Sequence, residues 1–112
     1  MQVRTRIFRY NKEEYMLTSK QRSNLKSIAA NLDPVAQCGK NGIGENMVKS
    51  LSDALEAREL IKVNVLTNAE DDAKSLGAEL ASALRAECVA VIGRKVILYR
   101  RSSRKDFKHI EF

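Results

Sequence analysis

The chain has 112 residues, of which 44 % are hydrophobic, and this length gives room for one domain with a modest core. Its apolar residues are dispersed among charges, and no apolar run approaches the roughly 18 to 20 residues needed to cross a bilayer. The sequence also shows no signal peptide. We therefore expect a cytoplasmic protein that does not engage membranes. The 20 lysines and arginines exceed the 14 acidic residues, and the net charge of +6 favours polyanionic partners, although the positions of these charges must decide between partners.

The first segment, residues 1–15, shows no helix or strand period. We interpret it as a flexible extension, either a basic arm or a leader added to the protein, and place the start of the domain at residue 16. Thr18 and Gln21 predict a capping box at the start of a helix. The apolar stripe of this helix has spacings of three and four residues and consists of Leu25, Ile28, Ala29 and Leu32. Pro34 ends the helix, because proline disfavours helical geometry in the residue before it.

Residues 35–38 predict a short strand, and residues 45–57 predict a second helix with Glu45 at the positive end of its dipole. One face of this helix is apolar and carries Met47, Val48, Leu51, Ala54 and Leu55. Residues 60–66 follow as a strand with an alternating pattern, in which Ile61, Val63 and Val65 alternate with Lys62 and Asn64. The alternation predicts one buried face and one wetter face.

A third helix is predicted after the caps Asn68 and Asp71. Its apolar face consists of Ala73, Leu76, Leu80, Ala83 and Leu84. Two apolar runs, residues 88–92 and 95–100, are then separated by residues 93–94, Gly-Arg, which is the pattern of a tight hairpin between two strands.

The predicted order is therefore helix, strand, helix, strand, helix, strand, strand. Strand-helix-strand connections normally form right-handed parallel crossovers, whereas a hairpin makes its two strands antiparallel. The fold class is thus α/β, a single domain with a mixed four-stranded sheet and helices packed against it. We place this domain at residues 16–101 and expect the basic tail, residues 102–112, to fray after the last strand.

A glycine loop, Gly39-Lys40-Asn41-Gly42, joins the first strand to the second helix. Glycines permit positive φ angles and let a ligand backbone approach closely. An oxyanion is favoured here by three features: outward-pointing amides, the helix N-terminus behind the loop, and the charge of Lys40. Asn41 can also donate hydrogen bonds. The loop therefore suits binding of a sugar-phosphate chain. The alternative is that an isolated GxxG merely makes a tight turn. The segment lacks both the Gly-Lys-Ser/Thr ending of a Walker P-loop and the spacing of a dinucleotide fingerprint.

Further basic side chains could extend this site. They are Lys20, Arg22 and Lys26 on the first helix, Lys49 on the second, and Arg94, Lys95, Arg100 and Arg101 around the final hairpin. If the hairpin and the first helix flank the loop, these residues form one footprint. If they do not, the residues are ordinary solvated charges.

Two segments, LTSKQRSNLKSIAANLDPVAQCGKNGIGENMVKSLSDALEARELIKV and VIGRKVILYR, are typical of a known family. Through them the stretch from Leu17 to about Arg101 resembles the YhbY-like family, the stand-alone bacterial form of the CRM domain (chloroplast RNA splicing and ribosome maturation). The resemblance implies a fold similar to the C-terminal domain of translation initiation factor three. It also implies that residues 39–42 clamp an RNA backbone as a KH-domain GxxG loop does, and that the protein associates with precursors of the large ribosomal subunit. Gly44 departs from the polar or small residue expected at the start of the second helix.

Catalytic chemistry finds little support in the chain. Its single histidine, His109, lies in the polar tail, where we expect no shell of partners around it. The acidic residues 70–72 are better explained as compensation of a helix dipole than as a metal site. Cys38 and Cys88 can form neither a disulfide framework nor a zinc site, and we expect half-buried thiols. We therefore predict no enzymatic activity, no metal, no cofactor and no small-molecule substrate.

The sequence thus predicts a monomeric protein that binds structured RNA, rRNA in large-subunit precursors, and assists assembly of the large ribosomal subunit. The predicted RNA-binding residues are Gly39, Lys40, Asn41, Gly42, Lys20, Lys26, Lys49, Arg94, Lys95 and Arg100. Two alternatives remain open: an adaptor that docks on a ribosomal protein or assembly factor through its helical face, and a small enzyme that uses the glycine loop for a phosphate ligand.

Overall fold

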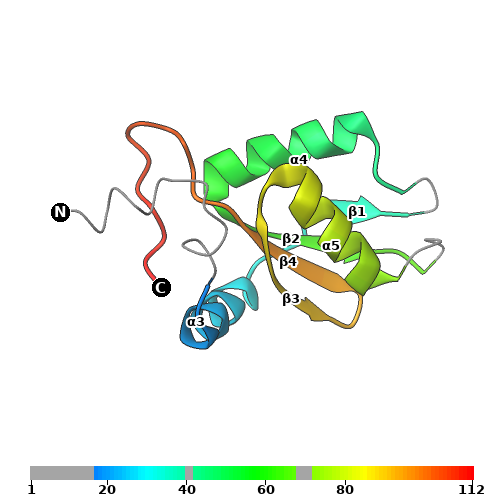
Figure 1. Cartoon of the computed structure of the whole chain (residues 1–112), viewed down its shortest axis with the longest axis horizontal. Coiled ribbons are helices and arrows are strands. Elements are labelled where there is room, and N and C mark those ends of the chain that lie inside the picture. The colour runs from blue at the N-terminus through cyan, green and yellow to red at the C-terminus, as the bar shows by residue number, and fades with distance from the viewer. Residues whose placement is uncertain (1–16, 40–41, 68–71) are drawn as a thin grey trace.

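Four strands form a mixed sheet in the computed structural model, which describes residues 17–39, 42–67 and 72–112 (Figure 1). The elements in chain order are α3 (Ser19–Ala29), β1 (Ala36–Cys38), α4 (Glu45–Arg58), β2 (Leu60–Val65), α5 (Ala73–Leu84), β3 (Glu87–Ile92) and β4 (Lys95–Tyr99). The spatial order of the strands is β1-β2-β4-β3, with β1 and β2 parallel and the other neighbours antiparallel. This confirms the predicted fold class and element order. The predicted extension, Lys40, Asn41 and the predicted caps Asn68 and Asp71 lie outside the described residues.

Each face of the sheet carries its own hydrophobic cluster. α4 and α5 pack on one face, where the buried residues include Leu51, Leu55, Ile61, Val63, Val65, Leu76, Leu80, Leu84, Val96 and Leu98. α3 packs on the opposite face with a cluster of Leu25, Ala29, Leu60, Val89 and Ile97 (Figure 1). Because successive strand residues point to opposite faces, neighbouring residues of β2 belong to different clusters.

The prediction of a wetter face on β2 is wrong for Lys62. This residue is only 7 % exposed, whereas Asn64 is half-buried. β2 is an inner strand of the sheet, and α3 covers the face that Lys62 shares with Leu60. The long apolar stem of a lysine allows it to line a covered face of this kind.

Two helices begin with side-chain caps. The predicted capping box at α3 is confirmed, since the Gln21 amide donates to Thr18 Oγ1 (3.1 Å) and the Thr18 amide donates to Gln21 Oε1 (2.9 Å). The predicted caps of α5 are wrong, because Asp72 occupies the N-cap position and accepts from the Ser75 amide at 2.8 Å. The backbone and side-chain hydrogen bonds from Ser75 lower the pKa of Asp72. The cap is the residue directly before the first helical residue, and that residue is Ala73.

α5 approaches the sheet closely at Gly77. A Cβ atom on this residue would lie 3.2 Å from Cγ1 of Val96 and 3.3 Å from Sγ of Cys88. Both distances are shorter than ordinary van der Waals contacts, so a Cβ here would require the side chains of Val96 and Cys88 to shift by a few tenths of an ångström. Gly77 therefore allows the close packing of α5 on β3 and β4.

β3 is an edge strand, and its regular pairing with β4 is interrupted by a bulge. Cys88 pairs with Leu98 and Ala90 with Ile97, which leaves Val89 as the extra residue. The guanidinium of Arg22 on α3 donates to the carbonyl oxygens of Cys88 (2.8 Å) and Val89 (3.4 Å). It also forms an ion pair with Glu87 at 3.0 Å. Arg22 therefore attaches α3 to the edge of the sheet.

The C-terminal tail folds back on the domain, so the prediction that it frays is wrong. Glu59, which is fully buried and has a φ angle of 67°, accepts hydrogen bonds from the amides of Ser102 (2.7 Å) and Ile110 (2.8 Å). The same carboxylate contacts Nδ1 of His109, so the expectation of a histidine without partners is wrong as well. A buried carboxylate is costly without hydrogen bonds, and the tail supplies them.

Arg100 closes the same end of the sheet. Its guanidinium donates to the carbonyl oxygens of Leu84 (2.9 Å) and Ser52 (3.0 Å), and to Oε2 of Glu56 (3.1 Å). Glu56 accepts a further hydrogen bond from the amide of Ser103 at 3.0 Å. Burial raises the pKa of Glu56, but the hydrogen bonds from Ser103 and the charge of Arg100 outweigh this effect and leave that pKa lowered. We call this region, formed by Glu59, Arg100 and residues 101–112, the tail end of the sheet.

Candidate nucleic-acid interface

The glycine loop follows β1 directly and is closed by hydrogen bonds. The amide of Gly42 donates to the carbonyl of Gly39 at 3.0 Å. Gly42 has a φ angle of 69°, in the left-handed region that favours glycine. The thiol of Cys38, which is 1 % exposed, lies 3.6 Å from the carbonyl oxygen of Gly42 and donates to it. The backbone of the loop is thus fixed on both sides of Lys40 and Asn41.

The N-terminus of α4 lies immediately behind this loop. The N-cap residue is Gly44, which makes no side-chain hydrogen bond to the first turn. The first amides of a helix have no intrahelical acceptors, and the positive end of the helix dipole lies with them. Because glycine offers no side-chain acceptor, these amides are suited to an external oxyanion, and the oxyanion site expected from the loop pattern stays a prediction.

The β3–β4 hairpin lies at the same end of the sheet as the glycine loop (Figure 1). The last residue of β2 and the residue after it connect them, since the Val65 amide donates to the Arg94 carbonyl at 2.7 Å and the Leu66 amide donates to the Cys38 carbonyl at 2.8 Å. Arg94 and its neighbour Lys95 are exposed. We call the glycine loop, the hairpin and the first turns of α4 the loop end of the sheet.

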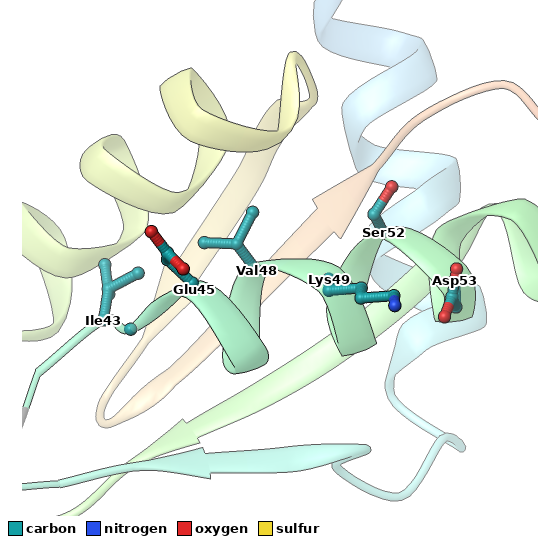
Figure 2. Close-up of a pocket in the computed structure, with 7 residues that line it drawn as sticks. Ile43, Glu45, Val48, Lys49, Ser52 and Asp53 are labelled. Atoms are coloured by element: carbon teal, nitrogen blue, oxygen red, sulfur yellow. The ribbon is translucent and has the colours of Figure 1, made fainter.

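An open groove of about 520 Å³ runs along α4 from the loop end. It is lined by Ile43, Gly44, Glu45, Val48, Lys49, Ser52 and Asp53. Figure 2 shows that Lys49 and Asp53 project from the same side of α4, one turn apart. The carboxylates of Glu45 and Asp53 oppose phosphate binding inside the groove. Lys49 is exposed, but Glu45 and Asp53 lie four residues before and after it on α4 and offset its charge.

Three predicted RNA-binding residues lie elsewhere. Lys20 and Lys26 are exposed on α3, which packs on the sheet face opposite to α4 and α5. The guanidinium of Arg100 is engaged by acceptors inside the protein, and its side chain is only 18 % exposed. The structure therefore gives Arg100 a structural role. Of the two alternatives left open for the basic residues, α3 fits that of solvated charges, since it lies on the other face of the sheet. The hairpin, in contrast, does lie with the loop.

The described residues contain no group of three or more histidine, cysteine or acidic side chains that could hold a metal ion. Cys88 is half-buried, and burial raises the pKa of its thiol, although the charge of Arg22 opposes this effect. A raised thiol pKa is unfavourable for a nucleophile.

Among the described residues, none of the helices has the length and apolar character of a membrane span.

Comparison with protein families gives a match over nearly the whole described chain. Residues 17–100 match the CRS1 / YhbY (CRM) domain. The chain belongs to this family. The CRM match includes the glycine loop, the hairpin and all seven described elements of the fold.

The relatives of this CRM domain include proteins with RNA-binding names. The "Probable RNA-binding protein YqeI" of Bacillus subtilis is 46 % identical, with 86 % of this chain and 98 % of that protein covered. A Haemophilus influenzae protein named "RNA-binding protein" is 34 % identical over 77 % of this chain and 87 % of that protein. The solution structure of the hypothetical protein SAV1595 from Staphylococcus aureus, 51 % identical, covers 86 % of this chain and 98 % of that chain with a TM-score of 0.70.

Sequence reasoning missed the residues that build the tail end. Glu59, Ser102 and His109 come from segments far apart in the chain, and Ser102 meets Glu59 across 43 positions. A weak signal for a folded tail was present in Ile110 and Phe112, two apolar residues that pack against the cluster beneath α3. Such isolated apolar residues in a polar segment are also common in unfolded tails.

Proposed function

We propose that this CRM protein is a non-catalytic RNA-binding protein that contacts the phosphate backbone through the loop end of the sheet. The RNA is rRNA in precursors of the large ribosomal subunit, and the protein assists their assembly in the cytoplasm by occupying or holding an RNA element. It acts as a monomer and needs no cofactor. The RNA-binding names of its relatives support the choice of ligand.

One observation carries this proposal. The glycine loop and the adjoining N-terminus of α4 share one end of the sheet with the exposed basic hairpin, which comes much later in the sequence. Backbone amides at a helix N-terminus bind a phosphate oxygen, and lysine and arginine neutralise neighbouring phosphates. This combination provides affinity without reading base edges, so we expect low sequence selectivity from the protein alone.

The test uses a loop-end variant and a control with the same loss of charge. The loop-end variant is Lys40→Gln, Arg94→Gln, Lys95→Gln. The control is Ser23→Glu, Lys26→Gln, Ser27→Glu, which lowers the net charge equally on exposed positions of α3. Each tagged protein is followed through density gradients of cell lysate at low and raised salt, and through binding to purified large-subunit rRNA.

Wild type and the control are expected to sediment with large-subunit precursors at low salt and to be released as salt rises. The loop-end variant is expected to stay near the top of the gradient and to bind the purified rRNA at least about tenfold more weakly, since it loses up to three phosphate contacts. RNA binding without sedimentation of wild type with any ribosomal particle would refute the ribosomal role. Salt-insensitive sedimentation of the loop-end variant would instead support the protein-adaptor alternative.

A further inference from the structure

A second group of basic side chains lies at the tail end of the sheet, away from the loop end. The tail runs back along the domain at the side opposite to the glycine loop (Figure 1). Its exposed basic residues are Arg104, Lys105 and Lys108, with Asp106 as the one acidic residue among them. The amide of Phe107 donates to the carbonyl of Arg104 at 3.4 Å, so the first two basic residues lie in a turn.

The tail that carries these charges is anchored on both sides of the basic turn. Before the turn, the Ser102 amide donates to Glu59, and the Ser102 hydroxyl donates to the carbonyl of Glu56 at 2.7 Å. After the turn, the Ile110 amide and His109 Nδ1 both contact the Glu59 carboxylate. A single buried carboxylate therefore fixes the entry and the exit of the segment.

This anchoring matters because a free tail would lose conformational entropy on binding a ligand. Ordering a residue costs backbone conformational entropy, and a pre-ordered segment has met that cost on folding. A basic turn held by the fold is thus better suited to phosphate contacts than the same residues on a frayed tail. Nothing in the packing of the domain requires these three side chains, since all of them are exposed.

We propose that the anchored tail is a second RNA-contact surface, in which Arg104, Lys105 and Lys108 neutralise backbone phosphates of the same RNA that the loop end binds. This inference rests on the proposed function. The two surfaces are separated by at least the length of β2, since Leu60 pairs with Tyr99 at the tail end and Asn64 pairs with Lys95 at the hairpin. A strand of this length spans roughly 17 Å at about 3.3 Å per residue, so one folded RNA can reach both surfaces.

The experiment measures binding of a transcribed stem-loop RNA with a single-stranded extension over a range of salt concentrations. Four full-length proteins are compared: wild type, the loop-end variant, the control on α3, and a tail variant Arg104→Gln, Lys105→Gln, Lys108→Gln. All three variants lose three units of charge, so a general charge effect is common to them. Circular dichroism and thermal unfolding check that each variant is folded, as we expect because the altered residues that the structure describes are all exposed.

The tail variant is expected to bind at least about tenfold more weakly than the control at low salt, and its plot of log K against log salt should be flatter by about 2 to 3. A tail variant that matches the control, while the loop-end variant loses affinity, would overturn the second surface and leave the proposed function intact. If wild type fails to bind the RNA, or the loop-end variant also matches the control, the proposed function itself is refuted.

Discussion

The two ends of the sheet differ in how they use charged side chains. At the loop end, Arg94 and Lys95 are exposed, and an added Cβ at Gly93 would meet no atom within 4 Å. At the tail end, Glu59 is fully buried and Arg100 donates to two carbonyl oxygens and a carboxylate. The loop end leaves its hydrogen-bonding capacity for a ligand, whereas these residues at the tail end consume theirs within the fold.

This contrast shows why net charge is a poor guide to an interface. Arg94 and Arg100 are six positions apart and belong to the same hairpin region, and both were predicted to bind RNA. The two arginines are distinguished only by the burial and the hydrogen-bond partners of their guanidinium groups. The difference predicts that substitutions at the buried Glu59 and Arg100 change stability, while those at the exposed Arg94 and Lys95 change binding.

The largest effect is expected from Glu59→Ala. The substitution leaves the amides of Ser102 and Ile110 without their acceptor, and unsatisfied buried donors are costly, so we expect a loss of about 3 kcal/mol in the free energy of unfolding. Urea denaturation measures it. The matched control is Arg85→Ala, because Arg85 is exposed and also has a positive φ angle, of 55°. Equal losses in both variants would mean that the backbone conformation, and not the carboxylate, sets the stability.

The second effect compares the two arginines. Arg100→Lys keeps the charge but cannot reproduce the planar group that reaches Leu84, Ser52 and Glu56, so we expect a loss of about 2 kcal/mol in the free energy of unfolding. Arg94→Lys should change stability by less than about 0.5 kcal/mol and retain RNA affinity within about threefold. Thermal unfolding and RNA titration test the pair, and a reversed ranking would contradict the contrast between the two ends.

The third effect concerns the hairpin turn at the loop end. Gly93 has a φ angle of 61°, which a residue with a Cβ adopts at a cost, so Gly93→Ala should destabilise the protein by about 1 kcal/mol. Gly93→Asn should recover much of this loss, because asparagine tolerates the left-handed region. Chemical denaturation of both variants provides the measurement. A loss as large with asparagine as with alanine would point to crowding, which the open surroundings of Gly93 do not predict.

The smallest effect is a pH dependence at Glu56. The pKa of this carboxyl is lowered in the folded protein, so its contribution to stability is present above the ordinary glutamate value of about 4.3 and is lost as the pH falls through the lowered value. Wild type should therefore be more stable than Glu56→Gln near neutral pH, and the difference should shrink on acidification below about pH 4.3. Denaturation at a series of pH values tests this. A constant difference would show that the charge of Glu56 is not involved.

Most elements could be predicted from sequence because their signals act over a few residues. The capping box of Thr18 and Gln21 and the turn at Gly93 are local, and both are confirmed. The end of the first helix was predicted less well, because the pattern extends the helix to Leu32 before Pro34, whereas α3 ends at Ala29. The buried position of Lys62 could not be predicted, since it depends on α3 crossing to the other face of the sheet.

The glycine loop and the basic hairpin of the candidate site could each be predicted from sequence, but their positions relative to each other could not. The glycine loop was visible in the chain, but its neighbours depend on the strand order, which places the hairpin beside the end of β2 and leaves α3 on the other face. The role of Arg100 depends on acceptors 16 and 48 positions away, which no local pattern encodes.

The contact of Arg22 with the edge of the sheet has a consequence for self-association. An edge strand normally presents free carbonyl oxygens that can pair with a strand from another molecule and start aggregation. The bulge at Val89 disrupts the regular spacing of β3, and Arg22 already occupies the carbonyl oxygens of Cys88 and Val89. This part of the edge therefore cannot act as a template for a further strand. The same arginine that holds α3 in place thus reduces the capacity of this edge strand to pair with another strand.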